Sequence, residues 1–122
     1  MGYEVGINLM QISESSKEEI EKIAYLASKY SLDVLYFADS LGSMSPESVS
    51  DIIKNLRTHW KGSLGIHTHD NMGRAMENSM QAISNGVTWV DSTVTGMGRG
   101  PGNLQTEYLV IEISEIKQIS IN

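Results

Sequence analysis

Two histidines, His67 and His69, are separated by a single residue at the end of the short apolar run 64–66. Such a run is typical of a strand, and side chains two residues apart on a strand point to the same face. Two neutral imidazoles on one face can bind the same divalent metal. Asp70 and Asn71 follow directly and offer oxygen ligands or hydrogen bonds to the ligands. The pattern indicates a metal site, although spacing alone leaves open that either histidine is a hydrogen-bonded residue of the core or the rim.

A glycine-rich loop from Gly96 to Gly102 ends at Asn103, where a helix is predicted to begin. Closely spaced glycines let the backbone approach a ligand, and the N-terminus of a helix favours an anion. Arg99 in this loop is a candidate to clamp a carboxylate or a phosphate. The spacing matches neither the dinucleotide fingerprint nor a phosphate-binding loop. A mobile surface loop, with Asn103 as an ordinary helix cap, remains the alternative.

A further candidate is Asp39, which follows the apolar run 33–38 and precedes Ser40, Leu41 and Gly42. Its carboxylate could bind a metal or transfer a proton, or it could order the turn through hydrogen bonds to the backbone. The sequence favours neither role. Spacing supports no Ser-His-Asp set and no pair of catalytic carboxylates.

These candidates lie between predicted strands and helices that alternate along the whole chain. Apolar runs predict strands at 3–10, 33–38, 64–67 and 88–94, and helical periodicity predicts helices at 16–30, 46–60, 72–85 and 103–117. Ser16 and Glu19 have the spacing of a capping box, and Pro46 suits the first turn of the second helix. The strands are continuous apolar runs, as in a parallel sheet buried on both faces. No linker or low-complexity tract interrupts residues 1–122, which are predicted to form a single α/β domain.

Four successive βα units with parallel strands fit either an open doubly wound sheet or part of a (β/α)8 barrel. A complete barrel takes about 250 residues, and this chain has 122. In both architectures ligands bind at the carboxyl ends of the strands. The polar residues that fall at those ends are Asn8, Gln11, Asp39, Ser40, His67, His69, Asp91 and Ser92.

The composition excludes several classes of function. The net charge of -6 disfavours nonspecific binding to nucleic acid or to an anionic membrane surface. The chain has no cysteine, which excludes disulfides, thiolate ligands and a cysteine nucleophile. No stretch is apolar enough to span a membrane, and the first residues lack the pattern of a signal peptide. We therefore expect a cytoplasmic protein that acts on a small molecule.

Several of these motifs, in this order, resemble one enzyme family. The matching segments are 38–42, 65–73, 90–93 and 96–103, together with Glu107. They are similar to the metal-dependent pyruvate aldolases and their relatives, which include 4-hydroxy-2-oxovalerate aldolase, 3-hydroxy-3-methylglutaryl-CoA lyase and 2-isopropylmalate synthase. The glycine loop and the helix after it look most like the aldolase branch. The resemblance implies half of a (β/α)8 TIM barrel, with this chain as its C-terminal half.

The resemblance also implies a chemistry. His67 and His69 would bind a divalent metal (Mn²⁺, Mg²⁺, Co²⁺ or Zn²⁺), with Asn103 as a third ligand. The metal would chelate a 2-oxo acid and stabilise the enolate that forms when a carbon–carbon bond breaks. The expected enzyme is an aldehyde-lyase that cleaves 4-hydroxy-2-oxo acids to pyruvate and an aldehyde, with Asp39 and Arg99 as catalytic residues.

One departure from the family pattern limits this expectation. The family takes a further metal ligand from an Asp-Arg-Glu motif, and this chain has no such motif among its three arginines, Arg57, Arg74 and Arg99. The cysteine of the acyl-CoA lyases is also absent. We therefore expect the chain alone to be inactive, and its partner to be the missing N-terminal half barrel or a second copy. An acyl-CoA condensing synthase and a non-catalytic metal-binding half barrel remain the alternative functions.

Overall fold

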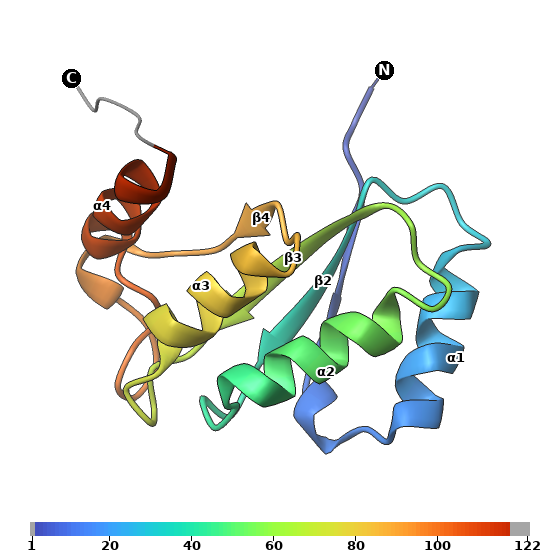
Figure 1. Cartoon of the computed structure of the whole chain (residues 1–122), viewed down its shortest axis with the longest axis horizontal. Coiled ribbons are helices and arrows are strands. Elements are labelled where there is room, and N and C mark those ends of the chain that lie inside the picture. The colour runs from blue at the N-terminus through green and yellow to red at the C-terminus, as the bar shows by residue number, and fades with distance from the viewer. Residues whose placement is uncertain (1, 118–122) are drawn as a thin grey trace.

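The computed structural model describes residues 2–117, which form a single sheet with helices packed on one side. The strands are β1 (Gly6–Leu9), β2 (Val34–Asp39), β3 (Ser63–Thr68) and β4 (Trp89–Val90), in the order β1-β2-β3-β4 and all parallel. The helices are α1 (Lys17–Ala27), α2 (Pro46–Leu56), α3 (Ala75–Ser84) and α4 (Thr106–Lys117), with short 3-10 turns η1 (Ile12–Glu14) and η2 (Val94–Gly96). This confirms the predicted α/β class and the four successive βα units (Figure 1).

The starts of α1 and α2 confirm the local signals in the sequence. The hydroxyl of Ser16 accepts the backbone N–H of Glu19 at 3.3 Å, and the Glu19 carboxylate accepts the backbone N–H of Ser16 at 2.7 Å. Ser45 caps α2 in the same reciprocal way with Ser48, and Pro46 occupies the first turn. These hydrogen bonds satisfy N–H groups that have no partner inside the helix.

Other predicted boundaries were wrong, and two of them are explained by hydrogen bonds. The helix predicted from residue 103 begins at Thr106, because Asn103 forms a β-bridge with His69. The helix predicted from residue 72 begins at Ala75, whose N–H donates to the Asp70 carboxylate at 2.9 Å. The first and last strands are also shorter than predicted.

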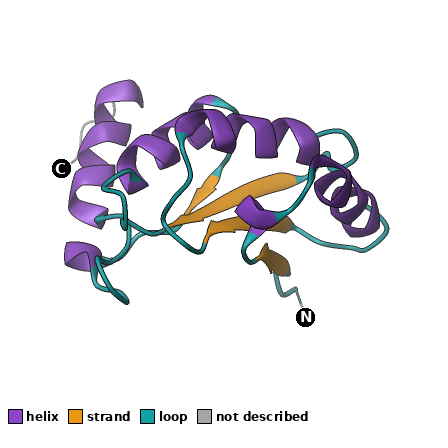
Figure 2. Cartoon of the chain, turned by 90° about the horizontal axis from the view of Figure 1, so that it is seen from below, coloured by secondary structure: helices purple, strands orange, loops and turns teal. Residues whose placement is uncertain are grey.

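The main hydrophobic core lies between the sheet and the helices α1, α2 and α3 (Figure 2). Inward-facing residues of β2 and β3, such as Leu35, Phe37 and Ile66, are fully buried there. The residues that pack on them from the helices include Ile20, Ala24, Val49, Ile53, Leu56 and Ala82. This layer fixes the sheet, and therefore the positions at which the strands end.

The opposite face of the sheet has no helix over it among the described residues (Figure 2). It is hollowed by a cavity of about 450 Å³ between β1 and β4, lined in part by Asn8, Tyr36, Trp89 and Asp91. β1 and β4 each pair with one strand only, so the sheet has two free edges. An uncovered parallel sheet of this kind is what part of a barrel presents.

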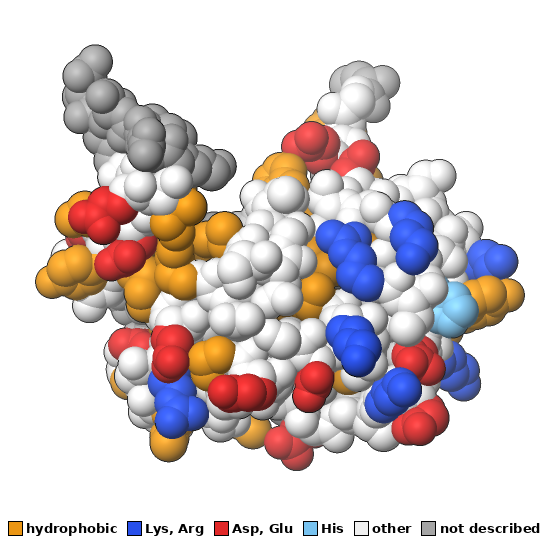
Figure 3. Space-filling model, viewed as in Figure 1, with side chains coloured by type: hydrophobic (Ala, Val, Ile, Leu, Met, Phe, Trp, Pro, Cys, Tyr) orange, Lys and Arg blue, Asp and Glu red, His pale blue; other side chains and the backbone are white. Residues whose placement is uncertain are grey.

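Helix α4 leaves much of its apolar surface exposed. Hydrophobic side chains gather around this helix in the space-filling view (Figure 3), and Val110, Ile111 and Ile116 are among the exposed large hydrophobic residues. Leu109 packs instead against Leu104 and Ala75 in a second, smaller core. No helix within residues 2–117 has the length and apolarity that a membrane crossing requires.

Candidate functional site

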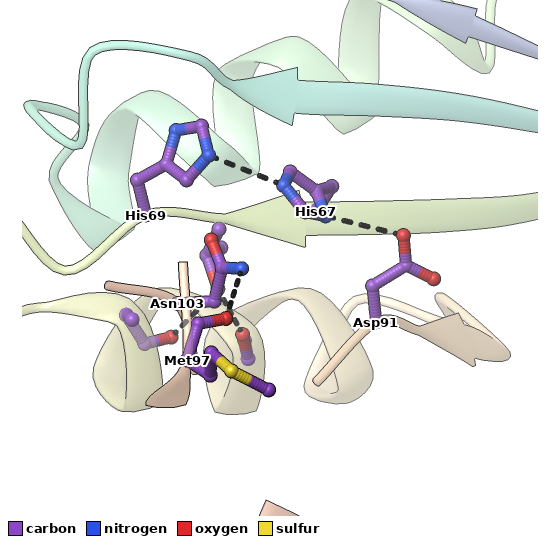
Figure 4. A network of polar contacts seen from close by, with 8 residues as sticks. His67, His69, Asp91, Met97 and Asn103 are labelled. Atoms are coloured by element: carbon purple, nitrogen blue, oxygen red, sulfur yellow. Dashed lines mark hydrogen bonds and ion pairs between the residues drawn. The ribbon is translucent and has the colours of Figure 1, made fainter. Parts of the chain in front are cut away.

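The two histidines of the sequence motif face each other at the carboxyl end of β3. His67 lies in the strand and His69 directly after it, and both side chains are half-buried. Their Nε2 atoms are 3.3 Å apart, and the two rings are nearly perpendicular, at 88° (Figure 4). The structure therefore brings together the pair that the alternation of strand side chains predicted.

The outer nitrogen of each ring is held by an oxygen atom. Nδ1 of His69 is 3.0 Å from the backbone carbonyl oxygen of Ser40, and Nδ1 of His67 is 3.2 Å from the carboxylate of Asp91. A carbonyl or carboxylate oxygen only accepts, so each Nδ1 must carry the hydrogen. In the neutral rings both Nε2 atoms then have a free lone pair, and these lone pairs converge. That arrangement suits a cation bound to both nitrogens.

Asn103 supplies a third donor beside the histidines (Figure 4). Its side-chain Nδ2 donates to the backbone oxygen of Met97 at 3.2 Å, which fixes the orientation of the amide. The amide Oδ1 is buried and, within the described residues, has no hydrogen-bond partner. A buried carbonyl oxygen without a partner costs free energy unless something else binds it. Two imidazole nitrogens and one amide oxygen are suitable ligands for a divalent metal, so these residues fit the expected ion.

The glycine loop shapes the surroundings of Asn103. A side chain on Gly98 would place its Cβ 2.6 Å from Nδ2 of Asn103, so this position must remain a glycine for the amide to fit. A Cβ on Gly96 would lie 2.9 Å from the backbone oxygen of Asn103, and one on Gly102 would meet the carbonyl oxygen of Gly96. That carbonyl accepts the N–H of Asn103 at 3.0 Å. Close packing in this loop is thus confined to Gly96, Gly98 and Gly102 around Asn103, while residues 97–101 are exposed at the surface.

No carboxylate completes this donor set. Across residues 2–117, no group of three or more His, Cys, Asp and Glu side chains is arranged to hold a metal ion. Asp91 is engaged behind His67 and Asp70 caps α3. The candidate ligands among the described residues are therefore all neutral.

Asp39 lies buried at the turn that follows β2. Its side chain is fully buried, and its two oxygens accept the backbone N–H groups of Ser43 at 3.0 Å and Met44 at 3.1 Å. The carboxylate orders the turn between β2 and α2, which was one of the two roles open from the sequence. The catalytic role expected for Asp39 stays a prediction beside this observed role in the turn.

Arg99 lies at a cavity next to the histidines. The cavity has a volume of about 590 Å³ and is lined by Met10, Gln11, Ser40, Leu41, His69, Asn71, Arg99, Gly100 and Pro101. No ion pair engages the Arg99 guanidinium within the described part of the chain. The structure thus places the candidate metal ligand His69 and the positively charged Arg99 on the wall of the same cavity.

Sequence analysis did not identify the residues that support the site. Asp91 was noted only as a polar residue at a strand end, and its contact with His67 depends on the register of β3 and β4. Tyr36 lies on the same face, and its pKa is raised to about 12 by burial first, then by the negative charge of Asp91 and a hydrogen bond to it. Asn78 and Ser79 were also missed as supports, although their inward position on a helix could have been found from its periodicity.

The chain is similar to known aldolases over most of its length. It is 38% identical over 116 residues to 4-hydroxy-2-oxovalerate aldolase of Geobacillus genomosp. 3, covering 95% of this chain and 34% of the relative. The aldolase of the same name from Pelotomaculum thermopropionicum is 39% identical over 115 residues, covering 94% of this chain and 34% of the relative. The chain therefore spans about a third of the length of these relatives.

Solved structures agree with the fold. The N-terminal domain of a putative aldolase from Bacteroides vulgatus matches with a TM-score of 0.89 and 32% identity, covering 98% of this chain and 40% of that one. An HMG-CoA lyase from Bacillus subtilis matches with a TM-score of 0.83 at 22% identity, over 96% of this chain and 43% of that one, and supports the fold alone. The likeness supports a part of a barrel within an N-terminal domain, while the expected place in the C-terminal half of that barrel stays a prediction.

The family assignment rests on the length of chain matched and on the order of the motifs. The HMGL-like family model matches residues 1–121. The match takes in the histidine pair, the glycine loop and Asn103, whose geometry is described above. The chain therefore belongs to the HMGL-like family.

Proposed function

We propose that this chain carries the metal-binding part of an aldolase that cleaves 4-hydroxy-2-oxo acids to pyruvate and an aldehyde. The observation that carries the proposal is the convergence of the two Nε2 atoms, 3.3 Å apart, beside a buried amide oxygen with no hydrogen-bond partner among the described residues. The names of the relatives that share about two-fifths of its residues point to the same reaction. The proposed protein is cytoplasmic, and the rest of the enzyme lies outside these residues.

In this proposal His67, His69 and Asn103 hold the divalent metal, which is Mn²⁺, Mg²⁺, Co²⁺ or Zn²⁺. When bound, the ion supplies Lewis-acid chemistry by polarising the keto group of a 2-oxo acid. The hydrogen bonds at both Nδ1 atoms keep each imidazole turned toward the ion without rearrangement. The chain thereby presents preorganised neutral ligands, and the anionic ligand comes from the remainder of the barrel.

Arg99 is proposed to bind the carboxylate of the 2-oxo acid. A guanidinium forms paired hydrogen bonds with a carboxylate, and Arg99 lines the same cavity as His69. The cavity also has an apolar part, formed by Met10, Leu41 and Pro101. We assign this part to the carbon chain of the aldehyde product, because apolar walls accept such a chain while excluding water.

The open face of the sheet is proposed to be covered by further βα units. Ile7 and Trp89 line the cavity on this face and are 43% and 40% exposed. Burying such a surface and closing the free edges of β1 and β4 would stabilise the fold. The covering element is either the N-terminal half barrel of the same enzyme or a second copy of this chain.

A second candidate function is metal binding without catalysis. It is favoured by the lack of a carboxylate in the donor set of residues 2–117. Both candidate functions require metal binding. They differ in pyruvate release, which only the aldolase shows. No observation favours an acyl-CoA condensing synthase.

The test measures metal binding and pyruvate release by the protein that carries this chain, with 4-hydroxy-2-oxovalerate as substrate. The double variant His67→Ala with His69→Ala should lose Mn²⁺ binding and pyruvate release together, because both lone pairs are removed. His59→Ala is the control, since His59 packs edge-on against Tyr25 at 5.5 Å, away from the site. Pyruvate release that persists in the double variant would refute the aldolase proposal, and Mn²⁺ binding without any pyruvate release would favour the second candidate.

A further inference from the structure

Three polar residues, Tyr36, His67 and Asp91, have their side chains on the open face of the sheet. Tyr36 of β2 pairs with Gly65 of β3, and Gly65 pairs with Trp89 of β4. His67 follows Gly65 by two residues and Asp91 follows Trp89 by two, so their side chains point to the same face as that of Tyr36. The Asp91 carboxylate is 3.2 Å from Nδ1 of His67 and lines the same cavity as Tyr36.

Gly65 makes room for the tyrosine ring. A Cβ built on Gly65 would lie 2.5 to 2.6 Å from three atoms of the Tyr36 ring, which is closer than real carbon atoms approach. The ring therefore packs on the backbone of β3 at Gly65, and this directs its hydroxyl toward Asp91, the residue that follows β4. A glycine inside a buried strand weakens the strand and often marks such a close approach.

We assign the hydroxyl of Tyr36 as a hydrogen-bond donor to Asp91, because both side chains line the same cavity on the open face of the sheet. Burial, together with the charge of Asp91 and the hydrogen bond to it, raises the pKa of Tyr36 to about 12, so the phenol keeps its proton at neutral pH. Asp91 can then accept from the phenol and from the imidazole at once, since an ionised carboxylate has four lone-pair sites. Two donors on one carboxylate restrict its rotation.

Resting on the proposed function, we propose that Tyr36 and Asp91 are positioning residues that hold His67 as its Nδ1–H tautomer and aim its Nε2 lone pair at the metal. Neither residue touches the ion or the substrate. His69 reaches the same state through the backbone carbonyl of Ser40, so it needs no side chain for this purpose. We therefore expect the tautomer of His67, but not that of His69, to depend on other side chains.

The first measurement is the tautomer of each histidine in the metal-free chain, read from ¹⁵N chemical shifts of the imidazoles. We expect the Nδ1–H form at both histidines in the wild type. In Asp91→Asn the new amide can donate to Nδ1 as well as accept from it, so His67 should become a mixture of tautomers while His69 stays unchanged. Tyr36→Phe should shift His67 in the same direction to a smaller extent.

The second measurement is the affinity for Co²⁺, followed by calorimetry and by the visible spectrum of the ion. Loss of an outer partner of a metal-bound histidine typically weakens metal binding by about 10- to 100-fold, and we expect a loss in that range for Asp91→Asn. Tyr36→Phe should weaken binding by a few-fold, as roughly expected when one neutral hydrogen bond is lost. Asp51→Asn and Tyr30→Phe, which change the same groups at exposed positions, are the matched controls.

The two readouts separate this proposal from the proposed function. If Asp91→Asn and Tyr36→Phe leave the tautomer of His67 unchanged, the positioning role is refuted, even where the affinity falls through loss of charge. If the wild type binds no Co²⁺, the proposed function fails, and the tautomers still decide whether Tyr36 and Asp91 orient His67. Gly65→Ala should reproduce the effect of Tyr36→Phe, because the new methyl group displaces the ring. If Gly65→Ala does not fold, the tautomer of His67 in Tyr36→Phe alone tests the role of the tyrosine.

Discussion

Replacing Asp39 with asparagine tests whether this buried carboxylate builds the site or takes part in the reaction. Its two oxygens accept the N–H groups of Ser43 and Met44 in a position that no solvent reaches. Asparagine has nearly the same shape but only one accepting oxygen. In Asp39→Asn one of the two backbone N–H groups must therefore face an amide NH₂, which cannot accept its hydrogen.

The magnitude follows from that lost acceptor. A hydrogen bond to a charged group contributes about 1.5–3 kcal/mol, and a buried donor left without a partner costs about 1–3 kcal/mol. Partial relaxation of the turn reduces the combined cost, so we expect the free energy of unfolding to fall by roughly 2–4 kcal/mol. This is a large share of the about 5–15 kcal/mol that stabilises a typical domain.

Urea unfolding followed by circular dichroism measures this change. With a denaturant slope of about 2 kcal/mol per molar urea, in the middle of the usual range, the midpoint should fall by roughly 1–2 M. Asp51→Asn, at an exposed position of α2, is the control and should leave the midpoint almost unchanged. An unaltered midpoint in Asp39→Asn, with pyruvate release abolished, would refute the turn-forming role and restore the catalytic one.

The same turn holds one side of the metal site, so the substitution should also weaken metal binding. The carbonyl of Ser40 accepts Nδ1 of His69 at 3.0 Å, and the carbonyl of Gly42 accepts the N–H of Met72 at 3.1 Å. A displaced turn loses both contacts. Lower Co²⁺ affinity together with lower stability is therefore the expected signature of Asp39→Asn.

Two further predictions concern a glycine and a tyrosine of this region. Gly42→Ala should destabilise the chain by more than the about 1–3 kcal/mol of a strained backbone, because Gly42 has a φ of +62° and its new Cβ would meet Asn71 at 2.6 Å. The control is Gly73→Ala, since Gly73 has a φ of +66° but nothing within 4 Å of its new Cβ. Urea unfolding compares the two variants, and an equal loss of stability in both would contradict the argument. In a spectrophotometric titration the last tyrosine to ionise, near pH 12, should disappear in Tyr36→Phe and move to lower pH in Asp91→Asn. Since folding raises this pKa, the contribution of Tyr36 to stability is present below about pH 10 and is lost as the pH rises through about 12.

The fold was predictable because its signals are local. Continuous apolar runs placed β2 and β3, and the side-chain pairs Ser16–Glu19 and Ser45–Ser48 cap helices within a few residues of sequence. The start of α4 was not predictable in this way. Asn103 has the local chemistry of a helix cap, but its backbone pairs with that of His69. The two residues are far apart in sequence, and only the folded chain brings them together.

The site divides along the same line. The histidine pair follows from the alternation of side chains on a strand, which is a property of three residues. The contact between His67 and Asp91 joins two strands, and its existence depends on their register. Asp39 shows a different limit, because one carboxylate at the end of a strand can serve a turn or a reaction with the same neighbours in sequence. The folded chain shows the role in the turn through the contacts with Ser43 and Met44, and the substitution of Asp39 tests the role in the reaction.

The neutral donor set also has a consequence for how a complete barrel would be held together. Two imidazoles and an amide leave the charge of a divalent ion uncompensated, and such ions bind more tightly when a carboxylate joins the ligands. The described residues hold no group of three or more His, Cys, Asp and Glu side chains suited to a metal, and Asp91, the partner of His67, lines the cavity on the open face of the sheet. If the carboxylate comes from the units that cover this face, metal binding and barrel closure must stabilise each other, since binding free energy is shared with assembly. The ion would then be a structural link between the two parts of the barrel as well as the Lewis acid of the proposed reaction.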